Sequence, residues 1–152
     1  MVYRIGKGKE IYLAQLVEIF MDTPLAAIYF KDKSPENIIA RGLKNGQVFV
    51  ALDEEKCVGF LLFEEQGTFG KYPYLHVLVV AEKYRQEGIG KQLINYYEEV
   101  LVEDYDKYFL MVGSYNEGAK RLYERLGYKP LCLLSDFYID GIDEWLMIKH
   151  KE

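Results

Sequence analysis

The chain has 152 residues, of which 50% are apolar and 15% aromatic, which suits one globular domain with a single substantial core. Its net charge of −5 at pH 7 argues against a general binder of nucleic acid or of anionic membranes, because such proteins carry basic patches. The N-terminus lacks the pattern of a signal peptide and no apolar run approaches a membrane span, so we expect one domain over residues 1–152 and a cytoplasmic location.

The N-terminal third is predicted to contain two helices. Apolar residues at helical spacing predict a helix over about residues 9–21, and Pro35 followed by Gly46 predicts a second helix that begins at Ser34. Residues 22–33 between them are expected to form a linker. The strands expected on either side of these helices are residues 2–5, 47–53 and 56–65, and a tight acidic turn joins the last two as a hairpin.

The two cysteines do not form a metal-binding pattern. Cys57 and Cys132 lie far apart in the sequence, and no cluster of histidines accompanies either of them. We therefore expect no metal site, and we expect both cysteines to pack as small apolar residues.

After a flexible loop at residues 66–70, a buried strand turns sharply into a helix at the centre of the chain. Residues 75–81 form an almost continuous apolar run, which is typical of a strand buried on both faces. Ile89 and Leu93 begin a helical pattern, and Gly88 and Gly90 lie in the turn before them. The first N–H groups of a helix have no partner within it, and the helix dipole favours negative charge there. The turn is therefore a candidate phosphate site.

The order of residues in this turn distinguishes between several phosphate-binding loops. A Walker A loop is excluded because Arg85 stands where its first glycine is required. A Rossmann fingerprint is excluded because Leu93 occupies the position of its third small residue. Residues 85–90 instead resemble Arg/Gln-x-x-Gly-x-Gly/Ala, the pyrophosphate loop of the GCN5-related N-acetyltransferase (GNAT) superfamily, at each specified position. A tight turn that binds nothing is the alternative.

The C-terminal third is predicted to add a strand, a helix and a strand pair. Residues 107–112 form an apolar strand, and Ser114 followed by Glu117 has the spacing of a capping box, which marks a helix start. Gly127 is expected to end that helix. The last two strands are expected near residues 128–134 and 142–150, with residues 135–141 as the loop between them.

A second motif agrees with the first one. Residues 116–128 resemble the GNAT signature Asn-x-x-Ala-x-x-x-Tyr-x-x-x-Gly-Phe/Tyr, and the predicted order of elements is similar to that of the superfamily over the whole chain. The resemblance implies an α/β fold, a single GNAT-like domain with a mixed central sheet of about seven strands flanked by about four helices. The matching positions are Asn116, Ala119, Tyr123, Gly127 and Tyr128.

The resemblance also implies a function. It implies an N-acetyltransferase that moves an acetyl group from acetyl-CoA to a primary amine by direct attack in a ternary complex. We expect a small-molecule amine as acceptor and partner, and the sequence allows a homodimer. The alternatives are a protein or peptide acetyltransferase, acting on lysine or on the N-terminus, and a non-catalytic acyl-CoA sensor.

Several residues take roles that the resemblance implies. Tyr123 occupies the position of the general acid, and an ordinary core tyrosine is the alternative for it. Glu87 departs from the common pattern because it places an acid within the loop. The residues that the resemblance implies for the coenzyme are Leu78, Val80, Arg85, Gln86, Glu87, Gly88, Ile89, Gly90, Lys91, Asn116, Ala119 and Lys120.

The acceptor amine must lose a proton before it can attack. Alternation along the central strand predicts that Tyr74 and His76 share a face with Leu78 and Val80, beside the thioester. His76 is the candidate base because histidine exchanges protons near neutral pH. A water chain, or no dedicated base at all, is the main competitor.

Aromatic and acidic residues in the two flanking segments suggest the acceptor class. Tyr29 lies in the linker, and Asp136 and Tyr138 lie in the loop between the last two strands. Carboxylates and aromatic faces both attract cations. We therefore predict that Tyr29, Tyr74, Asp136 and Tyr138 bind a small amine that carries a second positive charge or an aromatic group.

Overall fold

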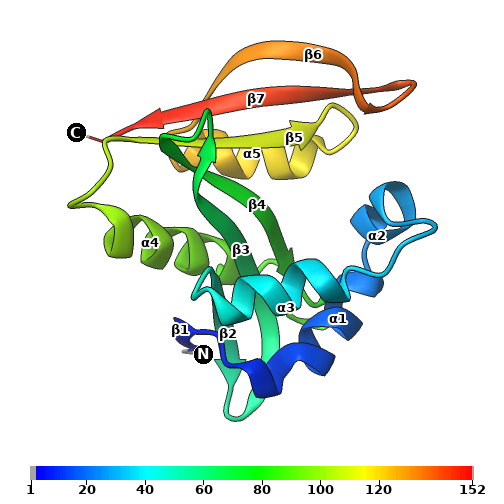
Figure 1. The fold of residues 1–152 in the computed structure, drawn as a ribbon, viewed down its shortest axis with the longest axis vertical. Coiled ribbons are helices and arrows are strands. Elements are labelled where there is room, and N and C mark those ends of the chain that lie inside the picture. Colours follow the sequence, from blue (N-terminus) through cyan, green and yellow to red (C-terminus); the bar gives the residue numbers. More distant parts are fainter. Residues whose placement is uncertain (1–2, 152) are drawn as a thin grey trace.

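Seven strands form one mixed sheet in the order β1-β2-β3-β4-β5-β7-β6 in the computed structural model, which describes residues 3–151 (Figure 1). All neighbouring strands of this sheet are antiparallel except β4 and β5, which are parallel. The strands are β1 (Arg4–Lys7), β2 (Val48–Asp53), β3 (Lys56–Thr68), β4 (Tyr72–Val80), β5 (Lys107–Gly113), β6 (Lys129–Ile139) and β7 (Ile142–His150).

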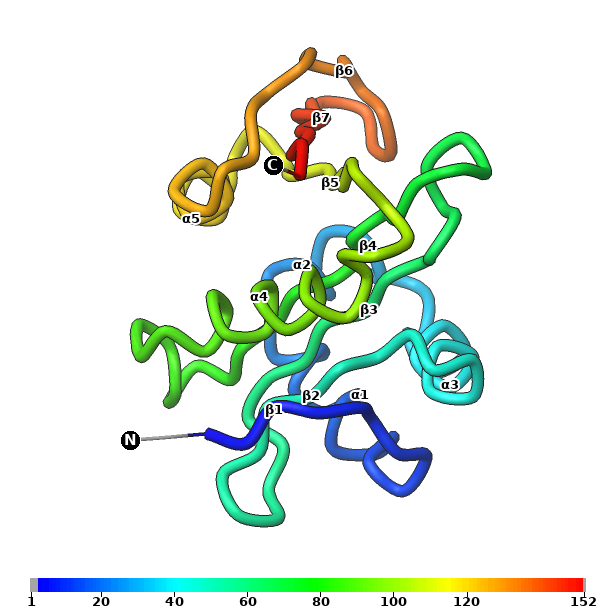
Figure 2. The backbone as a smooth tube through the Cα atoms, turned by 90° about the vertical axis from the view of Figure 1, so that its left-hand side faces the viewer, coloured from blue at the N-terminus to red at the C-terminus, as the bar shows by residue number. Residues whose placement is uncertain are grey.

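Helices cover both faces of the sheet. Figure 2 shows α4 and α5 on one side of it and α1 and α3 on the other. Two separate apolar clusters result, one containing Leu93, Tyr97 and Tyr123, and the other containing Leu16 and Phe20. The helices are α1 (Leu13–Met21), α2 (Pro24–Tyr29), α3 (Glu36–Lys44), α4 (Ile89–Leu101) and α5 (Glu117–Arg125), with short 3-10 turns η1 (Glu10–Tyr12) and η2 (Glu82–Tyr84). The predicted mixed α/β sheet is confirmed.

The two parallel strands separate soon after they meet. β4 pairs with β5 only at Tyr74 with Phe109 and at Leu75 with Leu110, whereas it stays paired with β3 as far as Val80. In Figure 1, β4 runs away from β5 towards the lower part of the molecule. Main-chain groups in the second half of β4 therefore lack a strand on one side, which creates a place for a ligand.

The N-terminal segments differ from the prediction in three places. The first strand begins at Arg4, and Val2 lies outside the described residues. Most of the predicted linker is helical, because Thr23 accepts a hydrogen bond from the Ala26 N–H and Pro24 takes the first helical position of α2. The predicted flexible loop is also partly strand, since β3 extends to Thr68.

The C-terminal segments contain further corrections. The capping residue of α5 is Asn116 rather than Ser114, because the Asn116 side chain accepts from the Ala119 N–H. β6 continues to Ile139, so most of the predicted loop at residues 135–141 is strand.

Cys57 in β3 is buried as predicted, but Cys132 in β6 is exposed. Among residues 3–151, no helix is long and apolar enough to cross a membrane.

Candidate active site

A cavity of about 320 Å³ lies where β4 and β5 diverge. Its walls come from both sheet faces and include parts of α1, α2 and α5 as well as four strands. The cavity brings together residues that are distant in the sequence. The predicted site residues that line it are Tyr29, Tyr74, His76, Leu78, Asn116, Ala119, Tyr123 and Tyr138.

The second half of β4 directs main-chain N–H groups towards this opening. The Ala81 N–H donates to the Val58 carbonyl on the β3 side at 2.8 Å. Since directions alternate along a strand, the N–H groups of Leu78 and Val80 point to the opposite side, where β5 has moved away. The carbonyl of Val80 is occupied, because it accepts from Arg85 Nε at 3.0 Å.

The glycine-rich turn has the geometry of an anion cradle. Gly88 is the N-cap of α4 with φ +82°, a left-handed conformation that only glycine adopts without cost. A Cβ at Gly88 would meet no protein atom within 4 Å, so the space above the turn is open. The Gln92 N–H donates to the Gly88 carbonyl, which leaves the earlier N–H groups of α4 without partners inside the helix. The turn therefore fits a pyrophosphate.

Two charged residues that were predicted to lie at the coenzyme, Glu87 and Lys120, contact neighbouring side chains. Glu87 Oε1 accepts from the Tyr3 hydroxyl at 2.6 Å, and this bond raises the pKa of Tyr3 to about 12. The acid in the loop is thereby tied to the segment before β1. Lys120 Nζ lies 5.0 Å from the centre of the Trp145 ring and 3.5 Å from Glu124 Oε1, while Lys91 is exposed.

Tyr123 projects from α5 into the cavity and is only 8% exposed. Burial raises the pKa of its hydroxyl, so the group stays protonated at neutral pH. Asn116, two turns of helix earlier, caps α5 with its side-chain carbonyl, which accepts from the Ala119 N–H at 3.2 Å. Its side-chain NH₂ can still donate to a ligand.

A bulge in β4 reverses the predicted orientation of His76. Leu62 pairs with Val77 but Phe63 pairs with Leu75, so His76 is an extra residue in the ladder. Leu78 and Val80 pack with the cluster under α4, whereas Tyr74 and His76 lie on the face of α1–α3. The prediction that all four share one face is wrong, because a bulge shifts the alternation by one residue.

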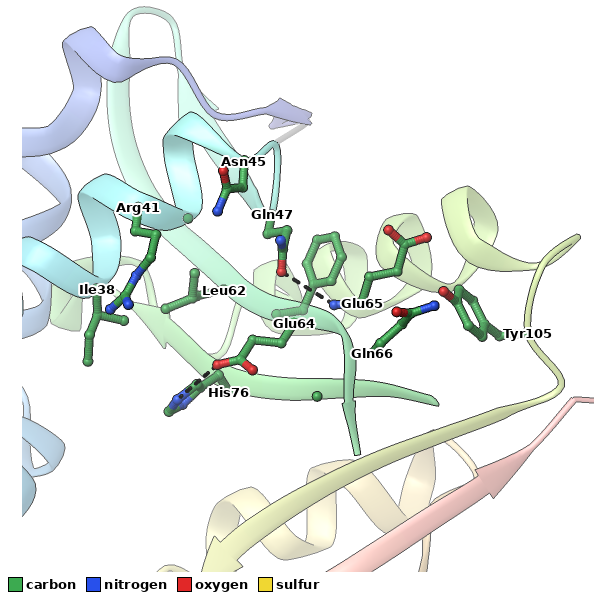
Figure 3. A pocket seen from close by; sticks show the side chains of 13 residues that line it. Ile38, Arg41, Asn45, Gln47, Leu62, Glu64, Glu65, Gln66, His76 and Tyr105 are labelled. Atoms are coloured by element: carbon green, nitrogen blue, oxygen red, sulfur yellow. Dashed lines mark hydrogen bonds and ion pairs between the residues drawn. The ribbon is translucent and has the colours of Figure 1, made fainter. Parts of the chain in front are cut away.

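His76 also borders a second, larger groove. This groove has a volume of about 730 Å³ and lies between α3 and the outer part of β3 (Figure 3). His76 Nε2 is 3.9 Å from Glu64 Oε1, and Arg41 of α3 faces the same space. His76 therefore stands at the boundary between the groove and the cavity at β4 and β5.

Tyrosines from α2, β4 and β6 contact one another and form part of the cavity wall. The rings of Tyr29 and Tyr138 meet edge to face with centroids 5.9 Å apart. The hydroxyls of Tyr74 and Tyr138 are 3.3 Å apart. These three predicted acceptor residues are thus brought together.

Asp136 does not line the cavity and lies instead in the irregular part of β6, just before the hairpin turn. Its Oδ1 accepts from the Gly141 N–H at 2.6 Å, and its own N–H donates to Asp143 Oδ1. The predicted acceptor role of Asp136 is therefore corrected. Its φ of +49° allows the carboxylate to close the turn between β6 and β7.

Glu144 is the cavity residue that the sequence analysis missed. It is 3% exposed, and its Oε2 accepts from the Tyr29 hydroxyl at 2.5 Å. Burial raises the pKa of Glu144, although the bond from Tyr29 acts in the opposite direction. The available signal was an acid next to Trp145 within a mostly apolar strand.

Comparisons with known proteins agree with this geometry. The model of the Acetyltransferase (GNAT) family matches residues 10–128. The N-alpha-acetyltransferase of Sulfurisphaera tokodaii is 28% identical over 156 residues, covering 93% of either chain. Human N-alpha-acetyltransferase 30 is 33% identical over 98 residues, which span 62% of this chain but only 27% of the human one. A chain of the NatC complex, solved with Gag peptide and CoA, superimposes with a TM-score of 0.82 at 17% identity, covering 100% of both chains.

Proposed function

This chain belongs to the acetyltransferase (GNAT) family and is an acetyl-CoA-dependent acetyltransferase, and we propose that its acceptor is the N-terminal α-amino group of a peptide or protein. The observation that carries the proposal is the similarity, over 93% of both chains, to a protein named N-alpha-acetyltransferase. It supports the predicted alternative, a peptide acceptor, better than the small-molecule amine that we predicted first.

The coenzyme would be held mainly by main-chain groups. Acetyl-CoA supplies the acetyl group as an activated thioester. The N–H groups at the start of α4 would bind its pyrophosphate, with Lys91 adding positive charge. The N–H groups of Leu78 and Val80 would bind the pantetheine arm and polarise the carbonyl group, and the Asn116 amide would support the arm.

Tyr123 would serve as the general acid. Its hydroxyl lies in the cavity, and burial keeps it protonated, so it can donate to a departing thiolate.

An α-amino group is easier to deprotonate than a lysine side chain, which makes it the easier acceptor for this reaction at neutral pH. An α-amino group has a pKa of about 8 and a lysine side chain one of about 10.4. At neutral pH the neutral, nucleophilic form is therefore roughly two hundredfold or more abundant for the α-amine. An enzyme that acts on the α-amine needs a weaker base.

The arrangement of the two hollows also suits a peptide. The first residue would occupy the cavity at β4 and β5, and the following residues would pass His76 into the groove beside α3 (Figure 3). The groove is lined by polar groups, including Gln47 and Glu64, which can bond to a peptide main chain.

A competition between acceptors tests the proposal. The purified protein and acetyl-CoA are given a peptide with a free N-terminus, the same peptide blocked at the N-terminus but containing lysine, and a polyamine, and thiol release and product mass are measured. We expect acetylation of the free N-terminus with the highest kcat/KM. Faster reaction of the blocked peptide or of the polyamine would overturn the proposal, as would coenzyme binding without turnover of any acceptor.

A further inference from the structure

Glu144 is the one charged side chain that is buried within residues 3–151. An ionised carboxylate loses several kcal/mol on burial unless a cation or several donors compensate it. Its partner is a neutral group, the Tyr29 hydroxyl, and no lysine, arginine or histidine of the described residues lies within 4.0 Å. The cavity thus contains a buried carboxyl group without the cation that would balance its charge when it is ionised.

Tyrosines surround this carboxylate. Burial chiefly raises the pKa values of Tyr29, Tyr74 and Tyr115, and the charge of Glu144 raises all three further, which reflects their proximity to it. Gly113 pairs directly with Glu144 across β5 and β7, and a Cβ there would overlap the Tyr115 ring. Aromatic faces around a carboxylate form an environment suited to an ammonium ion.

One carboxylate oxygen is available to a ligand. The Tyr29 hydroxyl bonds to Oε2, which holds the carboxylate in place and leaves Oε1 free to accept from a second donor. Tyr29 is itself fixed at the end of α2, and its ring packs against Tyr138. Tyr29 therefore acts as a positioning residue for Glu144.

We propose that Glu144 binds the ammonium group of the acceptor and removes its proton. The N–H bond of R–NH₃⁺ breaks and an O–H bond forms on Glu144, which leaves R–NH₂ with a free electron pair and a neutral carboxylic acid. The proton passes to water after turnover. This inference rests on the proposed amine acceptor, and it assigns to Glu144 the role that the sequence analysis gave to His76.

The environment of Glu144 favours proton transfer from the ammonium group of the acceptor to its carboxylate. The raised pKa of Glu144 narrows its difference from an α-amino group of pKa about 8. The other titratable groups that line the cavity are Tyr29 from α2, Lys33 after α2, Tyr74 and His76 from β4, Tyr123 from α5 and Tyr138 from β6, and Tyr115 before α5 is close enough to feel the charge of Glu144. Of these, His76 and Lys33 need separate variants in a pH experiment.

The main test compares Glu144→Gln with Asp140→Asn. Both variants remove one negative charge from the same hairpin, but Asp140 lies in the exposed turn. We expect kcat/KM for a free N-terminal peptide to fall by about 100-fold or more in Glu144→Gln, as for loss of a general base, and to stay within twofold in Asp140→Asn. The residual activity of Glu144→Gln should rise steeply with pH, because the acceptor must then lose its proton to solvent. His76→Gln and Lys33→Gln should keep the wild-type pH profile.

A second measurement does not depend on turnover. Glycinamide is titrated into the coenzyme-free protein, and the carboxyl carbon of Glu144 is followed by NMR. We expect a saturable shift in the wild type and in Asp140→Asn. Glu144→Gln lacks this carbon, so the glycinamide resonances report binding to that variant, and we expect no saturable shift of them. Tyr29→Phe should keep binding within threefold but lower kcat by about tenfold, because the carboxylate then loses its orientation.

The outcomes separate this inference from the proposed function. If the wild type acetylates peptides while Glu144→Gln retains kcat/KM and the wild-type pH profile, the inference is overturned and the function stands. If no peptide reacts but glycinamide binds only when Glu144 is present, the ammonium site stands and the peptide acceptor does not. Should Glu144→Gln lose its fold by circular dichroism, the kcat of Tyr29→Phe decides, and an unchanged value overturns the inference.

Discussion

The coenzyme turn and the acceptor cavity are built from the chain in opposite ways. The turn consists of the consecutive residues 85–90 and offers main-chain N–H groups to an anion. The cavity offers side chains from α2, β4, β6 and β7, and its central hydrogen bond joins Tyr29 to Glu144, 115 positions apart in the sequence. A site made of main-chain groups can be recognised from a local motif, whereas a site made of side chains depends on how distant elements pack.

Tyr123 lines the cavity from α5, the helix whose Leu122 lies next to Gly90 of the turn, and loss of its hydroxyl should have the largest effect. Tyr123→Phe keeps the packing and removes one hydroxyl, so kcat should fall by about 100- to 10,000-fold with coenzyme affinity within twofold. Steady-state kinetics and calorimetry measure the two quantities.

Tyr97→Phe is the matched control, because Tyr97 is also a buried tyrosine and its hydroxyl has no hydrogen-bond partner. This control should leave kcat unchanged and raise the free energy of unfolding by about 1 kcal/mol. Equal turnover in Tyr123→Phe and wild type would reduce Tyr123 to a core residue.

Gly88→Val should disrupt the coenzyme turn and leave the acceptor cavity unchanged. A branched side chain in the left-handed region is strained and would fill the open space above the turn, so the Kd for acetyl-CoA should rise by about 10- to 100-fold. Acceptor preference should stay the same. Calorimetric titration measures the affinity.

Gly70→Val supplies the control for backbone strain. Gly70 has φ +68° in the turn between β3 and β4, with no atom within 4 Å of an added Cβ, and it precedes β4, whereas the turn at Gly88 follows that strand. The control should bind acetyl-CoA with the wild-type Kd. An equal loss of affinity in both variants would assign the effect to strain rather than to the phosphate site.

His76→Gln tests how much His76 contributes to the acceptor site. Because the bulge turns His76 towards the groove beside α3, its loss should lower kcat/KM by only about two- to fivefold, and more for long peptides than for dipeptides. Kinetics on peptides of increasing length would measure this. A loss near 100-fold for all lengths would return the role of base to His76.

The smallest expected effect concerns stability. The folded-state pKa of Glu144 is raised, so its contribution to stability is fully present below the unfolded value of about 4.3 and is lost as pH rises through the folded value. Glu144→Gln should therefore raise Tm at pH 7 by a few degrees and leave it unchanged at pH 4. Calorimetry at both pH values tests this, and a lower Tm at pH 7 would show that the carboxylate stabilises the fold.

The sequence by itself determined the features that depend on local chemistry. The strand, turn and helix around Gly88 follow from an apolar run, two glycines and a helical repeat, and the structure has them at the expected positions. The same holds for Tyr123, which follows Asn116 by two turns of α5. Even α2 had a local signal in Thr23 and Pro24, so its omission was an error of interpretation.

Tertiary structure alone decided which side chains meet around the acceptor. The bulge at His76 arises from pairing between β3 and β4, and alternation along one strand cannot reveal it. Asp136 accepts a hydrogen bond from Gly141 within its own hairpin, whereas Glu144, on the neighbouring strand, is buried against Tyr29. The physical reason is that a main-chain site is defined by the conformation of a few consecutive residues, but the environment of a side chain is set by the packing of elements distant in sequence.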